Sequence, residues 1–216
     1  MIFPAISQSQ YLYDDGVRVF VVLDFDGVIN ALSKNSKSIE GFGNWQTFWQ
    51  PLYSDGWQRK YLLTWSPEMI AGLNVLFLDQ RVQLCWLTSW QEMVREPTKR
   101  MGLATESKRP PVIIDYRKKP FDDQIGKLDG LTSYFESIPE DASLIWVDDC
   151  LLAENGDYAS LVDDCCSQLS FGHRLTIGPN PLHGISPKEL QQISDFIRAH
   201  GGDDDRPRGD GKGPQG

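Results

Sequence analysis

One stretch decides the fold of this chain: Val19-Phe20-Val21-Val22-Leu23-Asp24-Phe25-Asp26-Gly27-Val28-Ile29-Asn30. Its apolar run is typical of a buried strand in a parallel sheet, and we predict the first strand over residues 18–29. Asp24 and Asp26 lie two residues apart, so both carboxylates project to the same face of a strand, and Gly27 lets the backbone turn behind them. Like charges this close repel each other, and a bound Mg²⁺ ion, which takes oxygen ligands, would relieve the repulsion. The alternative is an Asp-Gly turn whose acids only cap the turn.

Length and composition indicate one main domain. The chain has 216 residues, of which 40% are hydrophobic and 24% are charged, enough for one core and a small insertion. No apolar stretch approaches the ~20 residues of a membrane span, and residues 1–7 lack the pattern of a secretory signal. We therefore expect no membrane partner and a cytoplasmic location. The net charge of −9 argues against broad attraction to nucleic acid, although a local basic patch is compatible with it.

Cysteine and histidine do not form a recognisable metal site in the sequence. The four cysteines, Cys85, Cys150, Cys165 and Cys166, have no CxxC spacing, which favours reduced, buried thiols. The three histidines are spread over the C-terminal third without the spacing of a zinc site. A metal bound by oxygen ligands is therefore the better hypothesis.

Strand and helix patterns alternate along the chain after the first strand. Apolar runs predict further strands at residues 82–87, 112–114, 144–147 and 175–177. Helical spacing of apolar residues predicts helices that begin near Ser66 and near Asp122, and a capping box opens a last helix at Ser186. The strand at residues 82–87 leads into a helix that we expect Pro97 to kink or end.

This alternation predicts an α/β fold, a Rossmann-like doubly wound, mostly parallel sheet, in a single domain over residues 1–200. A small aromatic-rich insertion is expected at about residues 31–64, and residues 201–216 are expected to be a disordered tail. Sheets of this kind bind ligands at the carboxyl ends of their strands. The polar residues at those predicted ends are Asp24, Asp26, Thr88, Asp148 and Asp149. We expect them to gather along one edge of the sheet.

Carboxylates gathered in this way are suited to phosphoryl transfer. A metal ion and a lysine would neutralise the oxygen atoms of a phosphate ester, which lets Asp24 attack phosphorus and form an aspartyl-phosphate. Asp26 would protonate the leaving oxygen and later deprotonate the attacking water, a role that contributes on the order of 10² to 10⁴ in rate.

At this point the sequence resembles the haloacid dehalogenase (HAD-like) superfamily of phosphohydrolases. Asp24-Phe25-Asp26-Gly27 is similar to its first motif, and three further motifs follow in the same order on Thr88, Lys127 and Asp148-Asp149. The resemblance implies a nucleophile at Asp24, an acid and base at Asp26, and phosphate contacts from Thr88 and Lys127. It also implies Mg²⁺ ligation by Asp24, the backbone carbonyl of Asp26 and Asp148, with Asp149 assisting.

The third motif leaves a choice between lysines, because Lys118 and Lys119 also precede Asp148. We favour Lys127, since it lies near the start of a predicted helix, whereas Lys119 precedes Pro120 in an apparent loop. Dehalogenases lack the second acid of the first motif, so Asp26 indicates the phosphate-processing branch. Its expected substrate is a small phosphate ester or nucleotide, and a nucleic-acid end is possible.

Part of the chain also resembles HAD-like domains of bacterial and phage proteins of the RNA-repair type. The resemblance covers most of residues 18–198, including Leu63-Thr64-Trp65-Ser66-Pro67, Trp86-Leu87-Thr88-Ser89-Trp90 and Trp146-Val147-Asp148-Asp149. Those domains commonly accompany ligase or kinase modules, for which 216 residues leave no room.

The insertion lies where the superfamily places a cap that closes over the site. Its aromatic and basic side chains include Trp45, Trp49, Tyr53, Trp57, Arg59 and Lys60. They could stack on a nucleobase and pair with phosphate. The alternative, which we favour, is a small aromatic core that stabilises a short insertion.

Two other classes of protein share parts of this pattern. Response-regulator receivers carry the same residue types, but their paired acids precede the phosphorylated aspartate, whereas here Asp24 comes first and Asp148-Asp149 last. The second alternative is a HAD-like binding or scaffold protein without activity, although every expected polar position is filled.

Overall fold

The computed structural model describes residues 16–33, 39–54, 57–103, 109–116, 123–136, 142–152 and 156–202. The side chains of residues 52–54, 57–58, 123–124 and 156–159 lie outside this description. So do the greater part of the predicted tail, from residue 203, and the lysines at positions 118 and 119.

A parallel sheet of five strands forms the centre of the protein, in the order β5-β4-β1-β6-β7. Its strands are β1 (Val19–Leu23), β4 (Val82–Trp86), β5 (Val112–Ile113), β6 (Ser143–Val147) and β7 (His173–Ile177). Strand β1 pairs in parallel with β4 on one side and β6 on the other, so their carboxyl ends lie at the same edge. The predicted α/β fold with a parallel sheet is therefore confirmed, and the architecture is consistent with a Rossmann-like fold.

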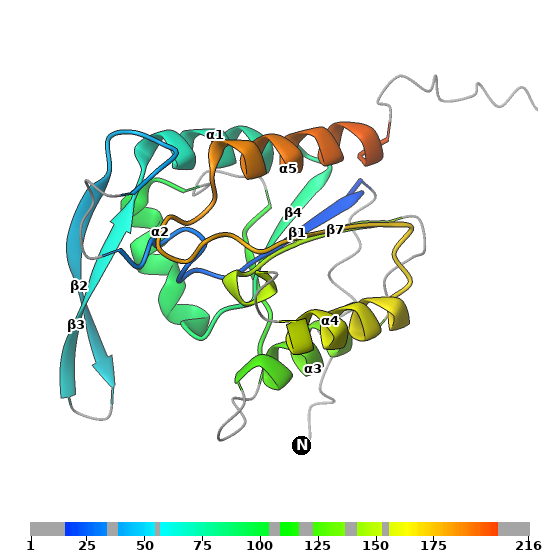
Figure 1. Ribbon diagram of the computed structural model, residues 1–216, viewed down its shortest axis with the longest axis horizontal. Helices are drawn as coiled ribbons and strands as arrows, with labels where there is room; N and C mark the ends of the chain where they lie inside the picture. The colour runs from blue at the N-terminus through cyan, green and yellow to red at the C-terminus, as the bar shows by residue number, and fades with distance from the viewer. Residues whose placement is uncertain are drawn as a thin grey trace, which may run out of the picture.

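Helices cover both faces of this sheet (Figure 1). Helices α1 (Pro67–Phe77) and α5 (Pro187–His200) lie on one face, and α3 (Asp123–Phe135) and α4 (Gly156–Gln168) lie on the other. The remaining helices are short: η3 (Gln91–Val94), α2 (Arg95–Met101) and η4 (Asp149–Leu151). The helix starts predicted at Ser66 and Ser186 are confirmed. The Ser66 side chain caps α1, and a complete capping box between Ser186 and Glu189 opens α5.

The first strand is shorter than the predicted 18–29. Strand β1 ends at Leu23, and Phe25 to Asn30 form a turn in which the backbone N–H groups of Ile29 and Asn30 donate to the Phe25 carbonyl. Gly27 has a φ of +73°, in the left-handed region, far from the extended backbone of a regular strand. Asp24 and Asp26 therefore belong to a strand end and a turn, and the rule of alternating strand faces does not apply to them.

One helix prediction was wrong, and one helix was missed. Pro97 lies in the first turn of α2, where backbone N–H groups have no partner within the helix, so it neither kinks nor ends α2.

Helix α4 was not predicted. Its buried positions Val162, Cys165 and Cys166, with Leu169 after them, have helical spacing. The four cysteines are reduced thiols, as predicted, but Cys150 is half-buried, whereas the other three are buried.

The insertion contains a hairpin of two nine-residue strands, β2 (Gln46–Ser54) and β3 (Trp57–Trp65). The hairpin lies to one side of the sheet and projects away from the two helical layers (Figure 1). Phe48, Leu63 and Trp65 on its inner face are buried in the same core cluster as β1 and α1. Trp49, on the opposite face, has 60% of its surface exposed, so it is not part of a separate aromatic core.

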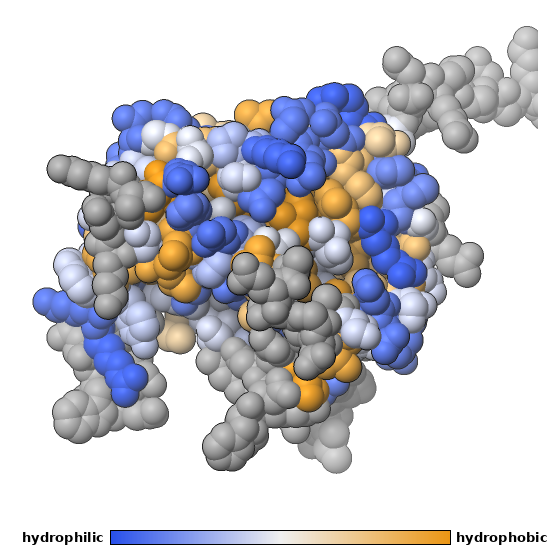
Figure 2. Space-filling view, in the orientation of Figure 1, coloured by the Kyte–Doolittle hydropathy of each residue, from blue (hydrophilic) through white to orange (hydrophobic). Residues whose placement is uncertain are grey.

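Buried side chains fill the space on both sides of the sheet. Val19, Val21 and Leu23 of β1 belong to one hydrophobic cluster, and Phe20 and Val22 belong to the other, as the alternation of a strand requires. On the face shown in Figure 2, hydrophobic residues are visible in several places, among them the band between the two helical layers. Among the described residues, no helix has the length and apolar character needed to cross a membrane.

A partly buried ion pair in the turn before β4 predicts a pH-dependent stability. The Arg81 guanidinium holds the pKa of Asp79 below its ordinary 3.8, and the two side chains lie 2.7 Å apart at their closest atoms. Because the folded pKa is the lower one, the pair stabilises the fold above pH 3.8, and its contribution is lost as the pH falls through the folded pKa. We expect Asp79→Asn to cost about 1 kcal/mol at pH 7, measured by urea unfolding, and to cost nothing in strong acid.

The control for this measurement is Asp195→Asn, which removes an exposed pair with Arg198 at 3.1 Å. It should cost at most about 0.5 kcal/mol at any pH. An Asp79→Asn cost that is equal at pH 7 and in acid would contradict a charge-dependent contribution.

Candidate functional site

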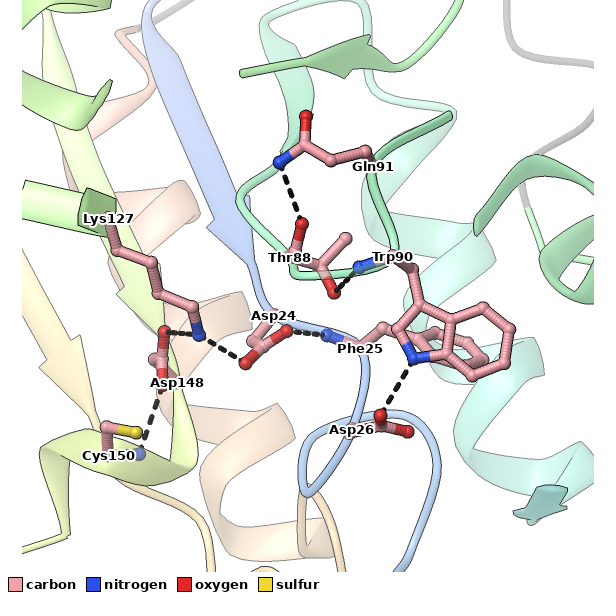
Figure 3. A network of polar contacts seen from close by, with 9 residues as sticks. All are labelled: Asp24, Phe25, Asp26, Thr88, Trp90, Gln91, Lys127, Asp148 and Cys150. Carbon is pink, nitrogen blue, oxygen red and sulfur yellow. Dashed lines mark hydrogen bonds and ion pairs between the residues drawn. The ribbon is translucent and has the colours of Figure 1, made fainter. Parts of the chain in front are cut away.

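A buried lysine joins the acids at the ends of two neighbouring strands (Figure 3). Asp24 directly follows β1 and Asp148 directly follows β6, and these strands are paired in parallel. The Lys127 ammonium, from α3, contacts Oδ2 of Asp24 and lies 2.7 Å from Oδ2 of Asp148. All three side chains are at least nine-tenths buried. Asp24 and Asp148 therefore meet at the carboxyl edge of the sheet, as their positions at predicted strand ends indicated, and Lys127 lies between them.

The remaining oxygens of these two acids accept backbone hydrogen bonds. Oδ1 of Asp24 accepts from the Phe25 N–H at 2.6 Å, and Oδ1 of Asp148 accepts from the Cys150 N–H at 3.0 Å. Each carboxylate is therefore held from two directions, and this fixes its orientation.

The charges of this cluster are unequal, because two carboxylates share one ammonium. Burial acts to lower the pKa of Lys127, but the carboxylates of Asp24 and Asp148 outweigh it and hold that pKa well above the ordinary 10.5. Lys127 is therefore a permanent cation. Burial raises the pKa of Asp148, and Lys127 opposes this shift.

Asp26 lies in the turn after β1 and is held by neutral donors. The Trp90 indole N–H donates to its Oδ2 at 2.7 Å, and the Asn30 side-chain amide donates to its Oδ1 at 2.6 Å. Burial raises the pKa of Asp26, and the two hydrogen bonds only partly oppose this shift. Asp24 and Asp26 thus have different partners although they are two residues apart.

Gly27 allows Asp149 to lie against the turn. A Cβ atom at position 27 would lie 2.6 Å from Cγ of Asp149, closer than side chains approach. Burial, together with the nearby carboxylates of Asp148 and Asp24, raises the pKa of Asp149 to about 6. The turn after β1 and the paired acids after β6 are therefore packed directly against each other.

We expect Gly27→Ala to destabilise the protein by about 3 kcal/mol, since it combines a strained positive φ with overlap on Asp149. Gly102→Ala is the matched control, because Gly102 has a φ of +80° and nothing within 4 Å of its added Cβ. It should cost about 1 kcal/mol from backbone strain alone. Denaturant unfolding of both variants measures the difference, and equal costs would contradict the contact with Asp149.

Thr88 follows β4 on the other side of Asp24 and is almost completely buried. Its hydroxyl accepts from the Trp90 backbone N–H at 3.4 Å, and its carbonyl accepts from the Gln91 side chain at 3.0 Å (Figure 3). The structure therefore places Thr88 at the same edge as the acids, where it supports the turn that carries Trp90.

The donor set fits a hard divalent cation. Four carboxylates, those of Asp24, Asp26, Asp148 and Asp149, lie around the Lys127 ammonium, so negative charge is in excess among the described side chains of the site. Oxygen donors of this kind suit Mg²⁺. Asp148, Asp149 and Cys150 have potential ligand atoms within 4.8 Å of one another, a cluster of a kind that is also common without a metal. This cluster identifies no particular ion.

Sequence reasoning missed three residues that contact the site. Trp90 and Asn30 hold Asp26, and the Cys150 backbone N–H and thiol lie beside Asp148. The only signal for Trp90 was its place two residues after Thr88, and Asn30 had none beyond its closeness to Asp26 in the chain.

Comparison of the chain with protein-family models, with curated proteins and with solved structures gave no match in any of the three. The resemblance to the HAD-like superfamily therefore rests on the sequence motifs alone.

Proposed function

We propose that this protein is a Mg²⁺-dependent phosphomonoesterase of the HAD-like type that acts through an aspartyl-phosphate at Asp24. The observation that carries the proposal is the buried bridge of Lys127 between Asp24 and Asp148. A permanent cation beside a strand-end carboxylate provides the charge that an incoming phosphate group needs. The raised pKa of Asp26 supports its role as the proton donor.

In the first step an oxygen of Asp24 bonds to phosphorus while the bond from phosphorus to the leaving oxygen breaks. The proton of Asp26 moves to that leaving oxygen, and the product alcohol departs. In the second step Asp26 takes a proton from a water molecule, whose oxygen bonds to phosphorus. The bond from phosphorus to Asp24 then breaks, which releases phosphate and restores both side chains.

The chain's other polar groups have supporting roles in this proposal. Lys127 holds Asp24 in place and offsets the charge of the phosphate oxygens. Thr88, at the same edge of the sheet, would contact the phosphate group. Asp24, Asp148, Asp149 and the backbone carbonyl of Asp26 would hold Mg²⁺, which when bound neutralises phosphate charge.

The hairpin β2–β3 is the part of the protein that we propose as a cap over the substrate. It follows the turn that carries Asp26 in the chain, and Tyr61 on β3, whose ring packs against Trp90, is 40% exposed. A leaving alcohol that carries an aromatic base, as in a nucleotide or a nucleic-acid end, would suit this ring.

The test is hydrolysis of 4-nitrophenyl phosphate and of a panel of sugar phosphates, mononucleotides and phosphorylated oligonucleotides by the full chain. Turnover is expected with Mg²⁺ and should disappear with a chelator and return when Mg²⁺ is added. Absence of turnover across the whole panel would contradict the proposal and favour a binding or scaffold role.

A further inference from the structure

The carboxylate of Asp26 is held differently from those of Asp24 and Asp148. Asp24 and Asp148 contact a cation, whereas both oxygens of Asp26 accept from neutral N–H donors, at 2.7 Å from Trp90 and 2.6 Å from Asn30. Within the described part of the chain, Asp26 makes no ion pair. The direction of this carboxylate is therefore determined by two hydrogen bonds.

The indole of Trp90 has little freedom to move. It is 4% exposed, and its ring packs edge-on against Phe25 and Tyr61, with centroid distances of 5.1 Å and 5.6 Å. Phe25 stands between Asp24 and Asp26 in the chain, and the Trp90 backbone N–H contacts the Thr88 hydroxyl. Figure 3 shows the indole N–H directed at Asp26 from the turn that follows Thr88.

The second donor, Asn30, uses its amide twice. While its N–H donates to Asp26, its Oδ1 accepts from the Thr64 backbone N–H at 2.8 Å. The backbone N–H of the next residue, Ala31, donates to the Thr64 carbonyl at 2.8 Å. Thr64 and Tyr61 both belong to β3, so both donors to Asp26 are braced by the same strand of the hairpin.

We infer that Trp90 and Asn30 are positioning residues that hold Asp26 in the orientation for proton transfer, braced by strand β3 through Tyr61 and Thr64. The inference rests on the proposed function, in which Asp26 protonates the leaving oxygen. A proton is transferred only at hydrogen-bonding distance and with good alignment, and a carboxyl group that has lost one donor rotates away from that alignment.

The dependence of the rate on the leaving group distinguishes positioning of the acid from a merely structural role. The nitro group of 4-nitrophenyl phosphate stabilises the departing phenolate, so this substrate needs little proton transfer, whereas phenyl phosphate needs it. Trp90→Phe keeps the ring and its packing but removes the N–H. We expect it to lower kcat/KM for phenyl phosphate by about 10- to 100-fold and for 4-nitrophenyl phosphate by less than about 3-fold.

Three further variants sharpen this test. Asn30→Ala removes the donor to Asp26 without adding a charge, so it should give the same selective loss. Trp146→Phe is the matched control, because Trp146 is also buried, and its indole N–H has no partner among the described atoms. It should leave the ratio between the two substrates unchanged. Asp26→Asn removes the acid itself. Its loss of kcat/KM for phenyl phosphate relative to 4-nitrophenyl phosphate is therefore the upper limit for the variants of Trp90 and Asn30.

The contact between Trp90 and Tyr61 of the hairpin is tested separately by NMR, through the indole N–H signal of Trp90. That signal is identified by its absence from the spectrum of Trp90→Phe. Asp26→Asn and Tyr61→Ala should shift this signal, and Tyr61→Phe, which keeps the ring, should not. If Trp90→Phe slows both substrates by the same factor, the positioning role is wrong and the proposed function stands. If the wild-type protein hydrolyses neither substrate, the proposed function falls and this inference falls with it.

Discussion

Replacing Asp24 with asparagine is expected to abolish phosphatase activity, by at least about 10⁴-fold, the scale of loss when an enzyme is deprived of its nucleophile. An amide does not attack phosphorus, so no aspartyl-phosphate forms. Steady-state hydrolysis of 4-nitrophenyl phosphate with Mg²⁺ measures the loss. Acid quenching during turnover, followed by mass spectrometry, should show a phosphorylated protein for the wild type and none for Asp24→Asn.

A second variant separates nucleophilic attack from the ion pair with Lys127. Asp24→Glu keeps the negative charge beside the ammonium but displaces the carboxylate by one methylene group, and misplacement of about 1 Å costs roughly 10²-fold in rate. We therefore expect Asp24→Glu to fold, to keep the ion pair and to lose most of its activity. Undiminished turnover by Asp24→Asn would contradict the assignment of the nucleophile.

The second large effect is expected from Lys127→Met, which removes the cation that contacts both buried acids. Asp24 and Asp148 would then face each other without compensation, and breaking a buried pair in this way costs about 3 to 5 kcal/mol. Methionine keeps most of the side-chain volume, so the loss reports charge rather than a cavity. Urea unfolding at pH 7 measures the cost, and turnover is expected to disappear as well.

The double variant Lys127→Met with Asp148→Asn tests whether charge is the cause. It removes one of the two unpaired acids, so most of the stability should return, while turnover stays absent because the phosphate still lacks its cation. Lys188→Met, at an exposed position near the start of α5, is the control and should change stability by less than about 0.5 kcal/mol. A Lys127→Met protein as stable as the wild type would show that the bridge is not needed for the fold.

The elements of the sheet were largely predictable because their signals are local. The apolar runs of β1, β4 and β6 and the capping residues of α1 and α5 each lie within a few consecutive residues. The extent of the first strand was wrong for a related reason. Phe25, Val28 and Ile29 are buried although they lie in a turn, and hydrophobicity alone does not distinguish a buried turn from a strand.

Helix α4 was missed although its pattern was present. Val162, Cys165, Cys166 and Leu169 are buried at helical spacing, but two of these four residues are cysteines, which were predicted to be buried and were not counted in an apolar helical pattern. Counting free cysteines as small hydrophobic residues would have revealed the helix.

The acids of the site followed from the sequence, since parallel strands bring their carboxyl ends to one edge and Asp24 and Asp148 stand at two such ends. Their partners did not follow. The contact between Lys127 and Asp24 spans 103 positions in the chain, and that between Trp90 and Asp26 spans 64. Residue types and spacings predict strands, helices and their ends because those depend on neighbouring residues. Which side chain donates to which acid depends on strand order and on the placement of the hairpin against the sheet, and only the folded chain decides these.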